Sequence, residues 1–214
     1  MPRQGAGQLR CGALLEKLFM RLLEIILGTL IIITMALSII LFPRFQSIIV
    51  LATGFTSMIY FYLSFAIFNG IHFKTIFNSQ SYKGIGQFRL IGAILTGFAL
   101  SIICIGILFR FQDYPKPNFI LSVGIIGVLI SGIVCIIKFK ETKSTFYKMI
   151  LFRIAFYGIL GFTLLIFPRE KMVEIKYRNY PAYIEAFKNS KADPNNKELR
   201  KKVAEERQKI FENK

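Results

Sequence analysis

Apolar runs of about twenty residues alternate with short polar or basic segments along most of the chain. Leu90 to Phe109 provides twenty residues without a charge, and at about 1.5 Å per residue such a helix spans the ~30 Å hydrocarbon layer of a bilayer. Phe119 to Ile137 provides nineteen more. Neither run has the polar face that a long helix of a soluble protein would show. The pattern therefore predicts a transmembrane helical hairpin at the centre of the chain.

The same pattern recurs on both sides of this hairpin and gives a predicted bundle over residues 22–167. Its five spans are 22–42, 47–68, 90–109, 119–137 and 149–167. Only four residues separate the first two spans, so these are predicted to be antiparallel neighbours. The predicted fold class is all-α: a polytopic helical membrane bundle with about five transmembrane helices and a basic, partly helical C-terminal tail.

Charged segments flank the predicted bundle. Residues 1–21 carry four basic residues against one acidic residue, which predicts a basic helix at the membrane surface; a mitochondrial presequence and a translation start at Met20 are the alternatives. Residues 168–214 have no run long enough to span a membrane and are predicted to be a soluble tail. From Pro194 onward the pattern predicts a charged helix capped by Asp193, which is either solvated or docked on a partner or on the membrane surface.

Composition and charge restrict the partners. The chain has 214 residues, 54% of them hydrophobic, and a formal net charge of +16. An excess of positive charge beside a bilayer favours contact with anionic lipid, and the sequence lacks the separate basic module with interleaved aromatics that is typical of nucleic-acid binding. We expect membrane lipids, mostly anionic, and either other membrane protein subunits or further copies of the chain as partners, and no nucleic acid.

The distribution of Lys and Arg predicts an orientation. Eleven basic residues near the span ends lie on the side of the N-terminus, and seven lie on the other side. The positive-inside rule therefore favours the N-terminus in the cytoplasm and the tail outside. A bacterial inner membrane is the expected location, with the mitochondrial inner membrane as the alternative.

Four hydroxyl side chains share one face of the second predicted span. They are Thr53, Ser57, Tyr60 and Ser64, at positions i, i+4, i+7 and i+11. Hydroxyl groups are poorly placed against lipid, so this polar stripe is predicted to point into the bundle. It would serve either as interhelical hydrogen bonds or as the wall of a polar path.

Small residues recur at every fourth position in the two central spans. The ladders are Ala93, Gly97 and Ser101 in one span, and Gly127, Ser131 and Cys135 in the other. Small residues let helix backbones approach closely where the hydrophobic effect no longer drives helices together. We predict that these two helices pack tightly through facing ladders, with dimerisation of two chains through the same faces as the alternative.

Glu24 and Arg153 are predicted to lie near the same membrane face, and His72 follows the second span on that side. A carboxylate and a guanidinium at similar depth are stabilised by pairing, because each alone is costly to place in lipid. An intramembrane Glu24–Arg153 ion pair is therefore a candidate. Separate side chains that each reach the interface, and a substrate or proton site that includes His72, are the alternatives.

The sequence contains none of the usual catalytic motifs. G-x-x-x-x-G-K-[ST], G-x-S-x-G and H-E-x-x-H do not occur, so phosphoryl transfer, acyl transfer and metal-dependent hydrolysis lack their usual groups. The single histidine and the three cysteines, Cys11, Cys104 and Cys135, have no metal-binding spacing. We expect no cofactor, no metal and no enzymatic activity.

The repeated ends of the spans carry a resemblance. A glycine-bearing helix, a Phe-Pro or Phe-Arg break and a second helix that ends in glycine occur twice, at Gly28, Pro43 and Gly70 and at Gly92, Arg110 and Gly132. This alternation is similar to the HdeD-type acid-resistance membrane proteins. The resemblance implies three helical hairpins, of which this sequence lacks the sixth helix.

A second resemblance covers one hairpin. The segment from Leu108 to Pro115, LFRFQDYP, looks like the hairpin break of the GldL-type gliding-motility motor proteins. It departs from that pattern at Asp113 and Tyr114, and no carboxylate follows in the next helix, so a motor role is not implied.

These observations favour an integral membrane subunit or scaffold protein without enzymatic activity. The alternative is a small transporter or channel with a polar path along the second transmembrane helix.

Overall fold

The computed structural model describes residues 4–40, 46–71, 75–114 and 116–212, with side chains from residue 22 onward. The described residues form eight α-helices, a short 3-10 helix at Ser79–Tyr82 and no strand. The α-helices are α1 (Gln4–Ile40), α2 (Gln46–Asn69), α3 (Gln87–Phe111), α4 (Pro117–Thr142), α5 (Thr145–Ile166), α6 (Arg169–Lys176), α7 (Pro181–Ala192) and α8 (Lys197–Glu212). The predicted all-α fold class is confirmed.

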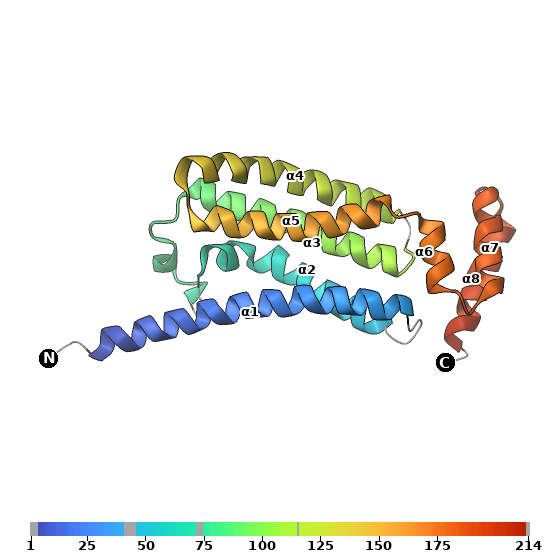
Figure 1. Ribbon diagram of the computed structural model, residues 1–214, viewed down its shortest axis with the longest axis horizontal. Helices are drawn as coiled ribbons and strands as arrows, with labels where there is room; N and C mark the ends of the chain where they lie inside the picture. The colour runs from blue at the N-terminus through green and yellow to red at the C-terminus, as the bar shows by residue number, and fades with distance from the viewer. Residues whose placement is uncertain (1–3, 41–45, 72–74, 115, 213–214) are drawn as a thin grey trace.

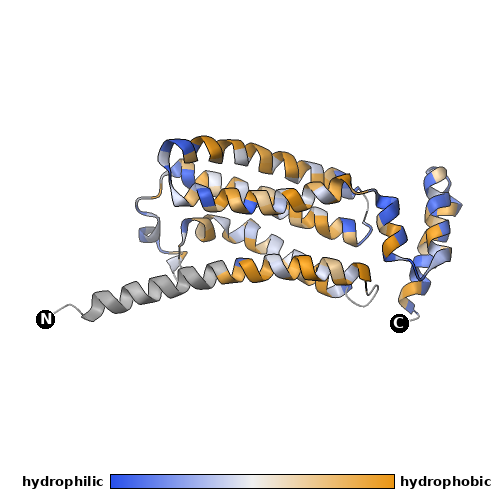
Figure 2. Cartoon of the chain, in the orientation of Figure 1, coloured by the Kyte–Doolittle hydropathy of each residue, from blue (hydrophilic) through white to orange (hydrophobic). Residues whose placement is uncertain are grey.

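Five of these helices are long and apolar enough to cross a membrane: residues 22–40 of α1, and α2, α3, α4 and α5. They lie side by side, with α1 along one edge of the bundle and α4 along the opposite edge (Figure 1). Hydrophobic residues cover the long helices, and hydrophilic residues gather at the bundle ends and in the tail (Figure 2). Because the chain crosses five times, the N-terminal side and the tail lie at opposite ends.

The outer surface of the bundle is apolar. Phe119, Leu129 and Ile133 of α4 are 68%, 60% and 59% exposed, and Phe152 of α5 is 73% exposed. Soluble proteins rarely expose contiguous apolar surface of this kind, whereas lipid tails solvate it. The buried positions of α4 form only a narrow stripe, at Leu121, Gly124, Val128, Gly132 and Cys135, so most of this helix faces lipid.

Helix α1 runs without a break from Gln4 to Ile40. The surface segment predicted over residues 1–21 and the first span are thus one helix over the described residues, and the side chains before residue 22 lie outside the description. From Leu22 onward α1 buries one face, which includes Leu27, Ile31 and Thr34, and packs mainly against α2.

The tail is more helical than the sequence predicted. The expected helix from Pro194 begins instead at Lys197, and its cap is Asn196 rather than Asp193, because the Asn196 side chain accepts hydrogen bonds from the backbone N–H of Glu198 and Leu199. Two helices precede it, α6 and α7, where the prediction placed none. They form a small core with α8 around Val173, Tyr177, Tyr183 and Ile210.

Two of the repeated helix ends meet in the structure. The sequence Arg-Phe-Gln occurs twice, at residues 44–46 and 110–112, so that Gln46, which begins α2, corresponds to Gln112, which follows α3. The Gln112 Nε2 donates to the backbone oxygen and to the Oε1 of Gln46, at 3.2 and 3.1 Å. The repeat therefore places equivalent polar residues at the tail end of the bundle, where they join the start of α2 to the end of α3.

Candidate functional site

An ion pair inside the bundle connects α1 to α5. The Arg153 Nε donates to Glu24 Oε1 at 2.7 Å, and its Nη2 donates to Glu24 Oε2, which gives a bidentate contact. The two side chains are only 8% and 14% exposed, and the guanidinium lies 4.8 Å from the centre of the Phe68 ring. The pair joins residues 129 positions apart in sequence, so it fixes α5 to the first helix.

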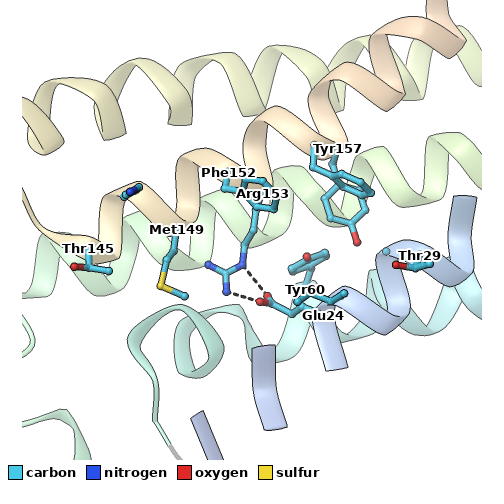
Figure 3. Close-up of a pocket in the computed structure, with 12 residues that line it drawn as sticks. Glu24, Thr29, Tyr60, Thr145, Met149, Phe152, Arg153 and Tyr157 are labelled. Atoms are coloured by element: carbon cyan, nitrogen blue, oxygen red, sulfur yellow. Dashed lines mark hydrogen bonds and ion pairs between the residues drawn. The ribbon is translucent and has the colours of Figure 1, made fainter. Parts of the chain in front are cut away.

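A pocket of about 530 Å³ opens beside this pair, between α1 and α5. Figure 3 shows Arg153 extending from α5 to meet Glu24, with Tyr60 and Tyr157 close to the pair and Thr145 and Met149 further along α5. The rest of the lining is mostly apolar and includes Ile25, Phe152 and Phe156. Thus one buried ion pair lies in the wall of a mostly apolar pocket, whose lining also includes Lys148 and several hydroxyl groups.

The predicted polar stripe of α2 is buried at all four positions, Thr53, Ser57, Tyr60 and Ser64. Ser57 Oγ lies 2.7 Å from Ser101 Oγ of α3, and Thr53 Oγ1 donates to the backbone oxygen of Ile49 in its own helix. Ser64 lies against α3 beside Gly97. Tyr60 alone of the four lines the pocket. Ser57 and Ser64 of the stripe therefore lie in the α2–α3 contact, and Thr56 is a further buried hydroxyl of α2 that the sequence interpretation left out.

Helices α3 and α4 pack tightly, as predicted, but the two small-residue ladders do not face each other, which corrects that part of the prediction. On α3, Gly97 and Ser101 face α2, because a Cβ at Gly97 would overlap Ser64 and Ser101 bonds to Ser57. Ala93 is fully buried on the same helix. The α3–α4 contact uses a different face of α3, since a Cβ added at Gly127 would lie 2.9 Å from Ala99 Cβ.

On α4 the closest approach to α3 is at Gly124, three residues before Gly127 and thus outside the predicted ladder. A Cβ at Gly124 would lie 2.7 Å from Ile103 Cγ1 of α3. Ser131 is only half-buried, whereas Cys135 is buried. The physical reason is that α3 is sandwiched between α2 and α4, so its small residues divide between two faces instead of forming one.

A second polar cluster fixes the tail to the bundle. The Asp113 side chain, in the α3–α4 connection, accepts hydrogen bonds at Oδ2 from Lys176 Nζ at 2.8 Å and from the Tyr177 hydroxyl at 2.7 Å. Lys176 also donates to the backbone oxygen of Phe111. The Lys176 and Asp113 side chains are 2% and 7% exposed, so α6 is held against the end of α3 by a buried contact.

The surroundings of this cluster shift its titration. Burial lowers the pKa of Lys176, and the adjacent Asp113 carboxylate opposes that shift. Burial also raises the pKa of Tyr177, with Asp113 adding to the effect, and burial raises the pKa of Tyr183 to about 12. Near neutral pH both tyrosines therefore keep their protons, and the Tyr177 hydroxyl remains a donor to Asp113.

The sequence interpretation missed this cluster, although a signal for α6 exists. Met172, Val173, Lys176 and Tyr177 are spaced i, i+1, i+4 and i+5, which is a helical periodicity, and all four are buried. Because Lys176 interrupts the apolar pattern, the segment that forms α6 was interpreted as part of a charged tail. Nothing in the pattern could connect Lys176 to Asp113, 63 residues earlier.

Replacing Asp113 with asparagine is expected to loosen the tail. A neutral amide at this position could no longer balance the Lys176 charge, and because Lys176 can respond by losing its proton, we expect a local loss of about 1–3 kcal/mol. Trypsin should then cleave α6 to α8 roughly tenfold faster or more. As the control, Glu174→Gln breaks an exposed ion pair with Lys188 and should change cleavage little; equal rates in both variants would contradict the buried contact.

The remaining site predictions concern metals and His72. Among the described residues no group of three or more His, Cys, Asp or Glu side chains could hold a metal ion. Cys104 and Cys135 are free and buried in the bundle. His72, the third member of one proposed polar site, lies outside the described residues.

Five apolar helices, a lipid-facing surface and an ion pair buried between helices define a multipass helical membrane protein. Comparisons with protein-family models, with curated proteins and with solved structures find no match.

Proposed function

We propose that this protein is a non-enzymatic subunit or scaffold of a membrane complex, which packs with partner membrane proteins and with anionic lipid. A bacterial inner membrane, with the N-terminus in the cytoplasm, is the setting that the sequence favours. The observation that carries the proposal is the folded tail. Its three helices are held to the bundle by the buried Lys176–Asp113 pair, so it offers a surface of fixed orientation at one membrane face.

The interior of the bundle supports the same proposal. Ser57 is bonded to Ser101, and Ser64 is packed against Gly97. The Ser57 hydroxyl bonds α2 to α3, and the small Ser64 side chain lies where the two helices approach closely, as expected when such side chains act in helix association. Such close packing between α2 and α3 favours the function of a scaffold.

The exposed side of α8 provides a contact surface. Lys201, Lys202 and Lys209 are exposed on this helix, and the acidic residues nearby pair only weakly with them at the surface. A basic helix at a membrane face suits an acidic segment of a partner protein.

Native mass spectrometry of the tagged chain, extracted in mild detergent, tests the proposal. We expect a stoichiometric complex with another membrane subunit or with further copies of the chain. The Asp113→Asn variant, whose tail is loosened, should lose that partner while the bundle remains folded. A chain that is monomeric and without partners across several mild detergents would overturn the proposal.

A small transporter is the second candidate function. The pocket between α1 and α5 favours it, because Tyr60 of the polar stripe lies there together with Glu24 and Arg153. Solute or ion flux into proteoliposomes, reduced by Tyr60→Phe, would support transport. Absence of flux together with a stable complex would leave the scaffold role.

A further inference from the structure

A basic pocket of about 460 Å³ lies where the tail meets the α3–α4 connection. Three guanidinium groups line it: Arg169 at the start of α6, and Arg200 and Arg207 one after the other along α8. Asp113 is the one carboxylate among the lining residues that the structure describes. Its Oδ2 already accepts from Lys176 and Tyr177, so positive charge is in excess around the cavity.

The arginines are held in place by neutral groups. Arg207 Nη2 donates to the backbone oxygen of Gln112 at 2.6 Å, and Arg200 Nη2 donates to the backbone oxygen of Pro194. Arg169 lies 5.6 Å from the centre of the Phe187 ring. The ion pairs of the described tail involve lysines and none of these arginines. Within the part of the chain that the structure describes, the three guanidiniums therefore form no salt bridge.

The position of the pocket relative to the membrane limits the kinds of ligand that it could bind. Asp113 comes two residues after the end of α3, and Arg169 comes three residues after the end of α5. Both therefore follow directly after helices that could span a membrane, where lipid headgroups are expected. One wall is aromatic and aliphatic, with Phe187, Val203 and Phe211, and would suit the carbon chain next to a charged group.

We propose that this pocket binds a phosphate-bearing anion, through Arg169, Arg200 and Arg207. Guanidinium groups match phosphate oxygens in bidentate hydrogen bonds, and basic pockets at membrane surfaces recognise phospholipid headgroups. The volume exceeds that of a bare phosphate and accommodates a phosphoglycerol-sized group. The inference rests on the proposed function for its contact with anionic lipid, and it assigns that contact to one defined site.

The test is thermal unfolding of the full chain in a neutral detergent. The probes are phosphatidylglycerol against phosphatidylcholine, and inorganic phosphate against sodium chloride at equal ionic strength. A bound anion raises the unfolding temperature in proportion to its occupancy. Stabilisation by phosphatidylglycerol alone identifies a lipid headgroup as the ligand, and stabilisation by inorganic phosphate as well identifies the phosphate group as sufficient.

Substitutions of the pocket arginines test whether the anion binds in this pocket. The double substitution R200Q/R207Q should weaken apparent binding about tenfold or more for each guanidinium removed. K201Q/K202Q removes the same charge from the same helix outside the pocket and should leave binding unchanged. Because Arg207 also contacts Gln112, R200Q alone and the charge-conserving R200K/R207K are measured too; R200Q should weaken binding, and R200K/R207K should retain part of it.

Two results would overturn the inference: no stabilisation of the unsubstituted protein by either phosphate source, or an equal loss in R200Q/R207Q and K201Q/K202Q. The scaffold proposal is tested separately, because the mass of the complex is measured on the same variants. A complex that persists while the phosphate response is missing would count against the pocket alone. A phosphate response in a chain without partners would count against the scaffold alone.

Discussion

Replacing Arg153 with methionine is expected to destabilise the folded bundle by about 3–5 kcal/mol, because it leaves the Glu24 carboxylate buried without its partner. The Glu24 side chain is 14% exposed, and both of its oxygens accept from Arg153. The orphaned carboxylate would be left in the wall of a mostly apolar pocket, without the guanidinium that balances its charge. Thermal unfolding in mild detergent, followed by circular dichroism, measures the loss.

A double-mutant cycle separates the pair from simple packing. Glu24→Leu alone should be as harmful as Arg153→Met, because it leaves the guanidinium buried. The double variant E24L/R153M removes both charges, and since apolar replacements of buried pairs are often neutral, it should recover most of the stability. Additive losses in the double variant would show that Glu24 and Arg153 do not act as a unit.

The sequence predicted that Glu24 and Arg153 lie at a similar depth, but it could not predict that the two side chains are in contact. Glu24 stands near the start of the first span and Arg153 in the first half of the fifth, and because these two spans run in the same direction, alternation of the spans puts both residues near the same face. Whether α1 and α5 approach each other depends on the order of helices around the bundle. Apolar runs that look alike on every side carry little information about that order.

The tail shows a different limit of sequence reading. Hydropathy correctly excluded a span after Pro168, yet α6 is anchored by Lys176, a residue that normally marks solvent exposure. Its burial depends on Asp113 and on the backbone oxygen of Phe111. A one-dimensional pattern shows the lysine and not the acceptors that surround it, so a charged tail was predicted where a docked helix lies.

The prediction that the two small-residue ladders face each other was wrong for a geometric reason. In α3, Gly97 and Ala99 are about 200° apart around the helix axis, so they face opposite neighbours. The sequence motif found the small residues correctly as close-packing positions, because Gly97 and Gly127 both lie where a Cβ would collide with another helix. It could not say which helix.

The close contact between α2 and α3 can be tested at Gly97. A Cβ at this position would overlap the Ser64 side chain and would lie 2.6 Å from the backbone oxygen of Tyr60. Because a backbone atom cannot turn aside as a side chain can, α2 and α3 would have to separate along the stripe that includes the Ser57–Ser101 contact. We expect Gly97→Ala to lower the stability of the bundle by about 1–3 kcal/mol or more.

Gly92 of the same helix provides the matched control, since a Cβ there would have no atom within 4 Å. Gly92→Ala should be neutral or slightly stabilising, because alanine is the better helix former. Adding Ser64→Gly to the Gly97→Ala variant should restore only part of the loss, because it removes the side-chain overlap and leaves the Tyr60 oxygen in place. Equal unfolding temperatures for the two alanine variants would mean that α2 and α3 do not meet at Gly97, and the polar stripe would then have to face something other than α3.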